Sequence, residues 1–114
     1  MGTFRFRVLG VVCEEGSGRP LEGLLVKAYD KDVFFDDFLG ERQTDANGRF
    51  EIQFTELDFR DVVEQRPDLY LRIFDPTGKR ELYSTIQSVR RNARSEEHFE
   101  IAIPATKLQA GALG

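Results

Sequence analysis

The sequence contains no tryptophan, one histidine, one cysteine and no long run of apolar residues. The single cysteine, Cys13, excludes an intrachain disulfide, and it has no neighbouring Lys, His or CxxC partner that would activate the thiol. We interpret Cys13 as a small apolar residue near the end of a strand. No segment approaches the ~20 apolar residues that a membrane-spanning helix needs, and Arg5 and Arg7 interrupt the N-terminal segment, which lacks the pattern of a signal peptide. We expect a soluble protein that is cytoplasmic as synthesised, with export as part of a larger assembly left open.

The chain is short and weakly acidic. Its 114 residues fit one domain and leave no room for a second core. Hydrophobic residues make up 40% of the sequence, including ten Phe, which is enough to build that core. The net charge of −4 opposes binding to nucleic acid or anionic lipid, so we expect a protein partner, no nucleic acid and no membrane insertion.

Alternating apolar and polar residues run through most of the chain. Such a period of two is typical of strands that bury one face, as where Phe4, Phe6 and Val8 alternate with Arg5 and Arg7. The pattern predicts seven strands, over residues 3–13, 21–29, 40–44, 49–54, 68–75, 81–89 and 97–103. The segments between them contain Gly, Pro, Asn and Asp, the residues of turns, with Gly48 or Asn47 expected to take a positive φ in the turn 45–48.

One short helix is predicted between the fourth and fifth strands. Residues 55–58 resemble a helix N-terminus, and Phe59, Val62 and Val63 follow at helical spacing before Pro67. Seven strands with one small helix do not fit α/β alternation. We therefore predict an all-β fold, a seven-stranded antiparallel two-sheet β-sandwich over residues 1–104, followed by a frayed C-terminal tail over residues 105–114.

Several short motifs resemble one group of β-sandwich proteins. They are GVV at 10–12, GRPLEG at 18–23, VKAYD at 26–30, LG at 39–40 and TDANGRFEI at 44–52. Together they resemble the transthyretin-like (prealbumin-like) and carboxypeptidase regulatory-like domains, and PDLYLRI at 67–73 is similar to bacterial members of that group. The resemblance implies the sandwich fold, but its motifs serve turns and core and say little about chemistry.

The resemblance implies two classes of function. The 5-hydroxyisourate hydrolases of this group use several histidines, an arginine and a C-terminal Tyr-Arg-Gly-Ser, whereas this chain has only His98 and ends QAGALG. A hydrolase of that type is therefore disfavoured. Other members resemble accessory modules, including those of bacterial toxin and secretion assemblies. We favour a non-enzymatic protein-interaction or structural module of that kind, with no cofactor.

The segment DKDVFFDDFL at 30–39 carries the strongest functional signal and is predicted to be an ordered loop. Its carboxylates could supply oxygen ligands to Ca²⁺, which gives a calcium-stabilised extracellular domain as an alternative; these residues are Asp30, Asp32, Asp36 and Asp37. Its aromatic side chains sit among charges. We expect one or two of them to plug the end of the sandwich and the remainder to form an apolar anchor for a partner. The predicted partner-binding residues are Phe34, Phe35, Asp36, Asp37 and Phe38.

Two further features are less specific. Arg90, Arg91 and Arg94 form a basic loop that is expected to be solvated, with an acidic partner surface as the alternative. Alternation places His98 on the exposed face of the last strand, without the Ser, Cys or acid that a catalytic motif requires. An exposed edge strand would also allow a homo-oligomer.

Overall fold

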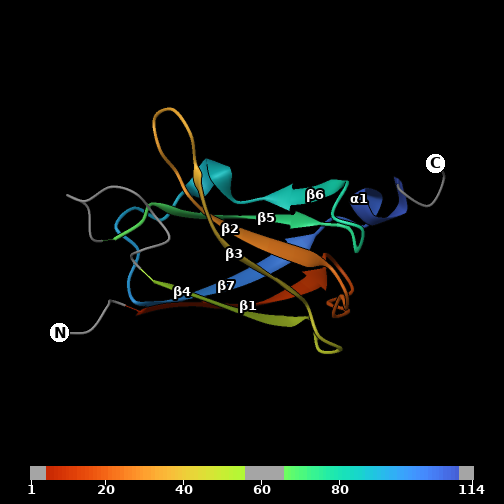
Figure 1. The fold of residues 1–114 in the computed structure, drawn as a ribbon. Helices are drawn as coiled ribbons and strands as arrows, with labels where there is room; N and C mark the ends of the chain where they lie inside the picture. The colour runs from red at the N-terminus through yellow and green to blue at the C-terminus, as the bar shows by residue number, and fades with distance from the viewer. Residues whose placement is uncertain (1–4, 56–65, 111–114) are drawn as a thin grey trace.

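The computed structural model describes residues 5–55 and 66–110, in which seven strands form two sheets (Figure 1). The strands are β1 (Arg5–Glu14), β2 (Leu25–Asp30), β3 (Asp37–Gln43), β4 (Arg49–Thr55), β5 (Leu69–Phe74), β6 (Glu81–Ser84) and β7 (Glu96–Ile103). A 3-10 turn, η2 (Ile86–Ser88), and the helix α1 (Ala105–Ala110) follow β6 and β7. The predicted all-β class and the predicted number of strands are confirmed.

One pair of strands departs from the predicted antiparallel arrangement. The sheets have the orders β4-β1-β7 and β3-β2-β5-β6. All neighbours are antiparallel except β1 and β7, which run parallel from the pair Arg7↔Glu96 to the pair Glu14↔Ile103. The prediction of a wholly antiparallel sandwich is therefore wrong. The chain reaches β7 from the other sheet through residues 85–95 and not through a tight hairpin, and such a crossover permits a parallel pair.

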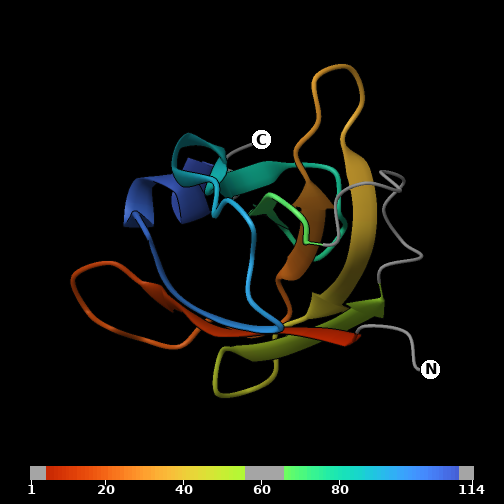
Figure 2. The same ribbon diagram turned by 90° about the vertical axis from the view of Figure 1, so that its left-hand side faces the viewer.

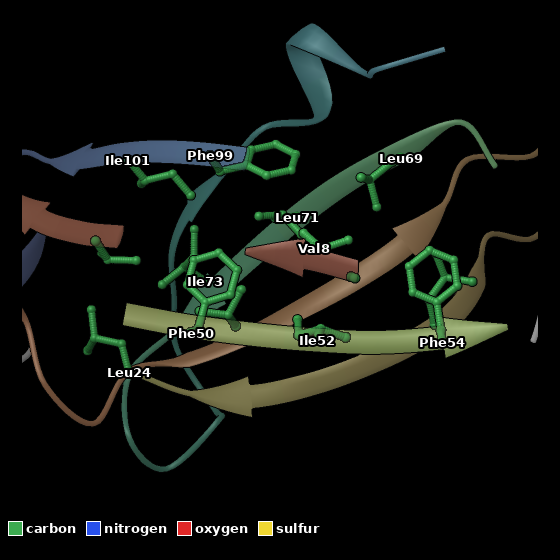
Figure 3. Packing of buried hydrophobic residues seen from close by; sticks show 14 of the residues in the cluster. Val8, Leu24, Phe50, Ile52, Phe54, Leu69, Leu71, Ile73, Phe99 and Ile101 are labelled. Atoms are coloured by element: carbon green, nitrogen blue, oxygen red, sulfur yellow. The ribbon is translucent and has the colours of Figure 1, made fainter. Parts of the chain in front are cut away.

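The core lies between the two sheets and follows the predicted alternation. On β4, Phe50, Ile52 and Phe54 are buried and point toward side chains of β5 such as Leu71 and Ile73 (Figure 3). The remaining strands contribute Phe6, Val8, Val12, Val26, Ala28, Leu69, Leu82, Phe99, Ile101 and Ile103. The strand β5 is buried on both faces, because its outward residues Tyr70 and Phe74 are also covered. Because residues on both of its faces are buried, β5 is the most enclosed strand of the larger sheet.

Several predicted boundaries change. The strand β3 begins at Asp37, within the predicted loop, and β6 ends at Ser84 because Thr85 exchanges hydrogen bonds with Leu71 through its N–H and its hydroxyl. The predicted frayed tail begins instead with α1, whose Leu108 packs against the core. The predicted helix after the fourth strand falls on residues 56–65, which lie outside the described residues. Among the described residues, no helix has the length and apolar character to cross a membrane.

Close packing at Gly10 gives a test of the arrangement. A Cβ atom on Gly10 would lie 2.6 Å from the carbonyl oxygen of Phe99 and 2.7 Å from the ring of Phe50. We expect Gly10→Ala to lower the free energy of unfolding by roughly 1–3 kcal/mol, because backbone and core must shift to admit the methyl group. Urea denaturation measures the loss, with Arg5→Ala at an exposed position of the same strand as the control. Equal midpoints for Gly10→Ala and the wild type would contradict this packing.

Candidate functional site: the β2–β3 hairpin

The most unusual surface of the domain is the tip of the hairpin that joins β2 to β3. Pairing of β2 with β5 ends at Asp30↔Leu69, and residues 31–36 continue beyond that end of the sheet. In both ribbon views this loop, coloured orange to yellow, stands clear of the body (Figures 1 and 2). Val33, Phe34 and Phe35 lie on it with 83%, 86% and 85% of their surface exposed. We call these three residues the tip.

The positions of the phenylalanines differ from one sequence prediction, and Val33 adds a residue to the predicted apolar anchor. We expected one or two of the phenylalanines to plug the end of the sandwich, but Phe34 and Phe35 are exposed and Phe38 is half-exposed. Phe34 and Phe35 cannot reach the core, because the hairpin carries them past the last pair of the sheet, whereas Phe38 lies within β3 and packs against the ring of Tyr29. Val33, which the sequence did not single out, joins them in one apolar surface. Contiguous exposed apolar side chains of this kind mark interaction sites.

The neck of the hairpin is held by the carboxylate of Asp36. The hydroxyl of Tyr70 on β5 donates a hydrogen bond to Asp36 Oδ2 at 2.5 Å, and the N–H of Asp32 donates to Asp36 Oδ1 at 2.9 Å. The ammonium of Lys31 lies 3.8 Å from Oδ1. Although burial raises the pKa of Asp36, these donors lower it below its usual value. Burial, followed by the bond to Asp36, raises the pKa of the Tyr70 hydroxyl, which therefore stays protonated and remains a donor.

Aromatic packing supports the same neck. The rings of Tyr29 and Tyr70 stack with centroids 5.4 Å apart, and the ring of Phe38 meets Tyr29 edge-on at 5.7 Å. The guanidinium of Arg72 lies 5.7 Å from the centre of the Tyr29 ring. Of the predicted partner-binding residues, Asp36 and Phe38 thus anchor the hairpin, whereas Phe34 and Phe35 form its apolar tip. Tyr70 is an anchor that the sequence analysis missed; its only signal was a hydroxyl on a strand whose other residues, apart from Arg72, are apolar.

Carboxylates gather at the base of the hairpin without forming a cluster of metal ligands. Asp30 Oδ1 accepts a hydrogen bond from the N–H of Asp68 at 2.8 Å, and Asp30 lies directly opposite Asp37 in the β2–β3 register. Burial raises the pKa of Asp30 to about 6, with a further rise from the charges of Asp68, Asp37 and Asp32. Among the described residues, no three His, Cys, Asp or Glu side chains are arranged to hold a metal ion. The geometry therefore gives no support to the calcium alternative.

Comparison with known proteins agrees with the sandwich. A model of the transthyretin-like family, TTR-52, matches residues 11–104. The chain belongs to the transthyretin-like family. No curated protein matches the sequence of this transthyretin-like domain.

Three solved structures similar to the transthyretin-like domain are a lipoxygenase and two dioxygenases. A 9R-lipoxygenase from Cyanothece PCC8801 is 26% identical with a TM-score of 0.64, over 86% of this chain and 16% of the lipoxygenase chain. The dioxygenase domain of a dioxygenase carbohydrate-binding protein fusion from Streptomyces sp. SirexAA-E is 17% identical with a TM-score of 0.53, over 90% and 81%. A 3-chlorocatechol 1,2-dioxygenase from Rhodococcus opacus 1CP is 14% identical with a TM-score of 0.50, over 90% and 61%. The two dioxygenase likenesses show the fold alone, and the chain spans only a small part of the lipoxygenase.

A second surface lies on the outer face of β4-β1-β7, where the transthyretin-like domain has an open groove of about 630 Å³. Leu9 and Val11 of β1 line it, between Arg42, Asp45, Arg49 and Glu51 on one side and His98 and Glu100 on the other. We call this surface the groove. The sequence analysis missed it, although Leu9 and Val11 continue the outward positions that Arg5 and Arg7 occupy earlier on the same strand.

The basic loop of the transthyretin-like domain is largely neutralised. The guanidinium of Arg90 lies 3.7 Å from the centre of the Phe99 ring and 2.8 Å from Glu97. Arg91 pairs with Asp68 at 3.0 Å. Within the described part of the chain, Arg94 is the only one of the three predicted arginines whose side chain has no ion-pair partner.

Two single residues remain from the sequence analysis. The His98 side chain is 67% exposed, as predicted, but its Nε2 lies 2.8 Å from the carboxylate of Glu96, an acidic partner that the sequence analysis did not expect. Cys13 is a half-buried free thiol close to the end of β1.

Tyrosine substitutions test the anchor of the hairpin. We expect Tyr70→Phe to lower the free energy of unfolding by about 1 kcal/mol, because one oxygen of Asp36 loses its donor. The same change removes one cause of the lowered pKa of Asp36, so that pKa should rise. Urea denaturation and carboxyl chemical shifts recorded against pH measure the two effects. Tyr83→Phe, at an exposed position of β6, is the matched control, and an unchanged Asp36 titration in Tyr70→Phe would refute the anchor.

Asp30 predicts a specific dependence of stability on pH. Its pKa of about 6 lies above the ordinary value of 3.8, so between these values the folded chain keeps a proton that the unfolded chain releases. The stability that Asp30 contributes is therefore fully present below pH 3.8, the pKa of the unfolded chain, and is lost as the pH rises through about 6, the pKa of the folded chain.

A conservative variant separates the effect of the Asp30 charge from the effect of its hydrogen bond with Asp68. Asp30→Asn keeps an oxygen for the N–H of Asp68 and carries no charge. We expect it to raise the free energy of unfolding at about pH 7.5 by ~1 kcal/mol, a value discounted for solvent screening of this half-exposed group, with little change near pH 4. Urea denaturation at both pH values measures it, and the exposed variant Glu22→Gln should follow the wild type. A loss of stability in Asp30→Asn at the higher pH would contradict the prediction.

Proposed function

We propose that this transthyretin-like domain is a non-enzymatic interaction module that docks a partner protein through the hairpin tip. The observation that carries the proposal is the high exposure of Val33, Phe34 and Phe35 on a loop whose neck is anchored. Exposed aromatic side chains cost free energy in water and recover it when a partner covers them. An anchored neck reduces the entropy lost on binding, because the loop is already ordered.

The charges around the tip favour a particular partner. Asp32 is exposed beside Val33, and Asp36 and Asp37 follow Phe35. The complementary surface is an apolar pocket with a basic rim, since opposite charges steer the encounter and like charges oppose it. An anionic membrane would repel the same carboxylates. A protein is therefore the partner that the composition of the hairpin favours.

The setting that we propose is an accessory domain, of the bacterial and carboxypeptidase regulatory-like kind, in a larger secretion or toxin assembly. The resemblance of its turn and strand motifs to such modules supports this. The match to a segment that forms 16% of a lipoxygenase chain is consistent with a sandwich that serves within a larger protein. An enzymatic role has less support, because His98 lies on the exposed outer face beside Glu96 and, in the described part of the chain, has no nucleophile among its hydrogen-bond partners.

Serine substitutions at the tip separate binding from folding. Because Phe34 and Phe35 are exposed, we expect Phe34→Ser/Phe35→Ser to leave the free energy of unfolding within about 0.5 kcal/mol of the wild type. A photo-crosslinking residue at position 34 should form discrete protein adducts in cells. Unlabelled wild-type chain should compete for them, and the double variant should not.

Two controls make this experiment decisive. The same crosslinker at Gln87, an exposed position of η2, should give none of these adducts. If the double variant unfolds readily, the rings belong to the core and the proposal fails. Cosedimentation of the wild type, but not of the double variant, with phosphatidylcholine vesicles would replace the protein partner with a membrane and overturn the proposal.

A further inference from the structure

The groove and the hairpin tip are complementary surfaces on the same chain. The tip is apolar and lies among carboxylates, whereas the groove has apolar residues between charged sides. We propose that the tip of one copy docks in the groove of a second copy, so that the domain assembles head to tail. This inference rests on the proposed function and names the partner.

The charges of the groove support an acidic occupant on its β3–β4 side. Arg42 and Arg49 are exposed there, and no carboxylate of the described residues lies within ion-pair distance of either. Two carboxylates, Asp45 and Glu51, line that side of the groove as well. Glu51 pairs with Arg7 at 3.0 Å, and Asp45 Oδ1 accepts hydrogen bonds from the N–H groups of Asn47 and Arg49. The two guanidinium groups can therefore meet the carboxylates of an incoming hairpin.

The composition and size of the groove also fit the tip. Leu9 and Val11 lie at its centre and offer the rings of Phe34 and Phe35 an apolar contact. The volume of about 630 Å³ falls in the range of roughly 300–1,000 Å³ that is typical of pockets for drug-sized groups. Two phenyl rings and one isopropyl group occupy less than this volume, so the groove has room for the tip.

The placement of the two surfaces requires a second copy. In both ribbon views the hairpin rises from the top of the molecule, and β1 and β4, which carry the groove on their outer face, lie at the bottom (Figures 1 and 2). The tip therefore cannot reach the groove of its own chain. A patch that fits a pocket elsewhere on the same molecule makes a heterologous contact, which leaves one tip and one groove free at the ends and can continue to further copies.

The expected affinity is low, because the contact is small. The tip buries far less than the roughly 1,200–2,000 Å² of a stable interface, so we expect a dissociation constant on the order of 10⁻⁴ M. Sedimentation velocity of the purified chain from about 10 μM to about 1 mM covers this range. The wild type should form dimers and larger species as its concentration rises.

Paired variants identify the two surfaces. Phe34→Ser/Phe35→Ser removes the tip, and Arg42→Glu/Arg49→Glu reverses the charge of the groove; each alone should weaken association at least tenfold. An equimolar mixture of the two should form dimers but nothing larger, because it contains one functional tip and one functional groove per pair. Lys79→Glu/Arg94→Glu, which alters two exposed cations elsewhere and gives the same net charge as the groove variant, should associate like the wild type.

The outcomes separate this inference from the proposed function. A wild type that stays monomeric at the highest concentration, or a groove variant that associates normally, overturns the head-to-tail contact. A mixture that forms no dimer does the same. None of these results alters the crosslinking test, in which discrete adducts to a different protein would still support the proposed function. Adducts at position 34 that contain a second copy of this chain would support both.

Discussion

The hydrogen bond from the Tyr70 hydroxyl to Asp36 connects the most enclosed strand of the larger sheet to its most exposed loop. Asp36 also accepts the N–H of Asp32, so one carboxylate holds both sides of the hairpin. Because β5 is buried on both faces, Tyr70 has little freedom, and neither does the neck that it anchors. The display of the tip therefore depends on an interaction between residues that are 34 positions apart in the chain.

The hydrophobic effect favours burial of aromatic side chains, yet those at the tip stay exposed because the hairpin extends beyond the sheet. The rings of Phe34 and Phe35 lie beyond the end of the sheet, out of reach of the apolar side chains between the layers. Carboxylates around the tip keep this apolar surface hydrated and limit nonspecific contacts. The groove lies on the opposite side of the molecule and has cations on one side. The domain thus presents two different surfaces on opposite sides, the tip and the groove.

Alternation predicted the fold well wherever one face of a strand meets the core. Phe50, Ile52 and Phe54 are buried as their spacing indicates, and the turn before them contains Gly48 with a positive φ of 74°. The same rule failed for the direction of β7, because a period of two has no direction. It also failed within residues 30–39, where charges and aromatics mix and no face is favoured. Composition singled out the segment that forms the exposed hairpin, but the prediction that one or two of its phenylalanines plug the end of the sandwich was wrong.

By itself, the sequence determined the number of strands, the inward residues of most strands and the position of the unusual loop, since local periodicity and turn chemistry act over a few residues. Only the tertiary structure decided that Phe34 and Phe35 face water, that Asp36 meets Tyr70, and that Leu9 and Val11 line a groove beside Arg42. These outcomes depend on which strand ends first and which sheet a distant strand joins. Whether a residue is buried depends on how the whole chain packs, so its neighbours in sequence do not determine its burial.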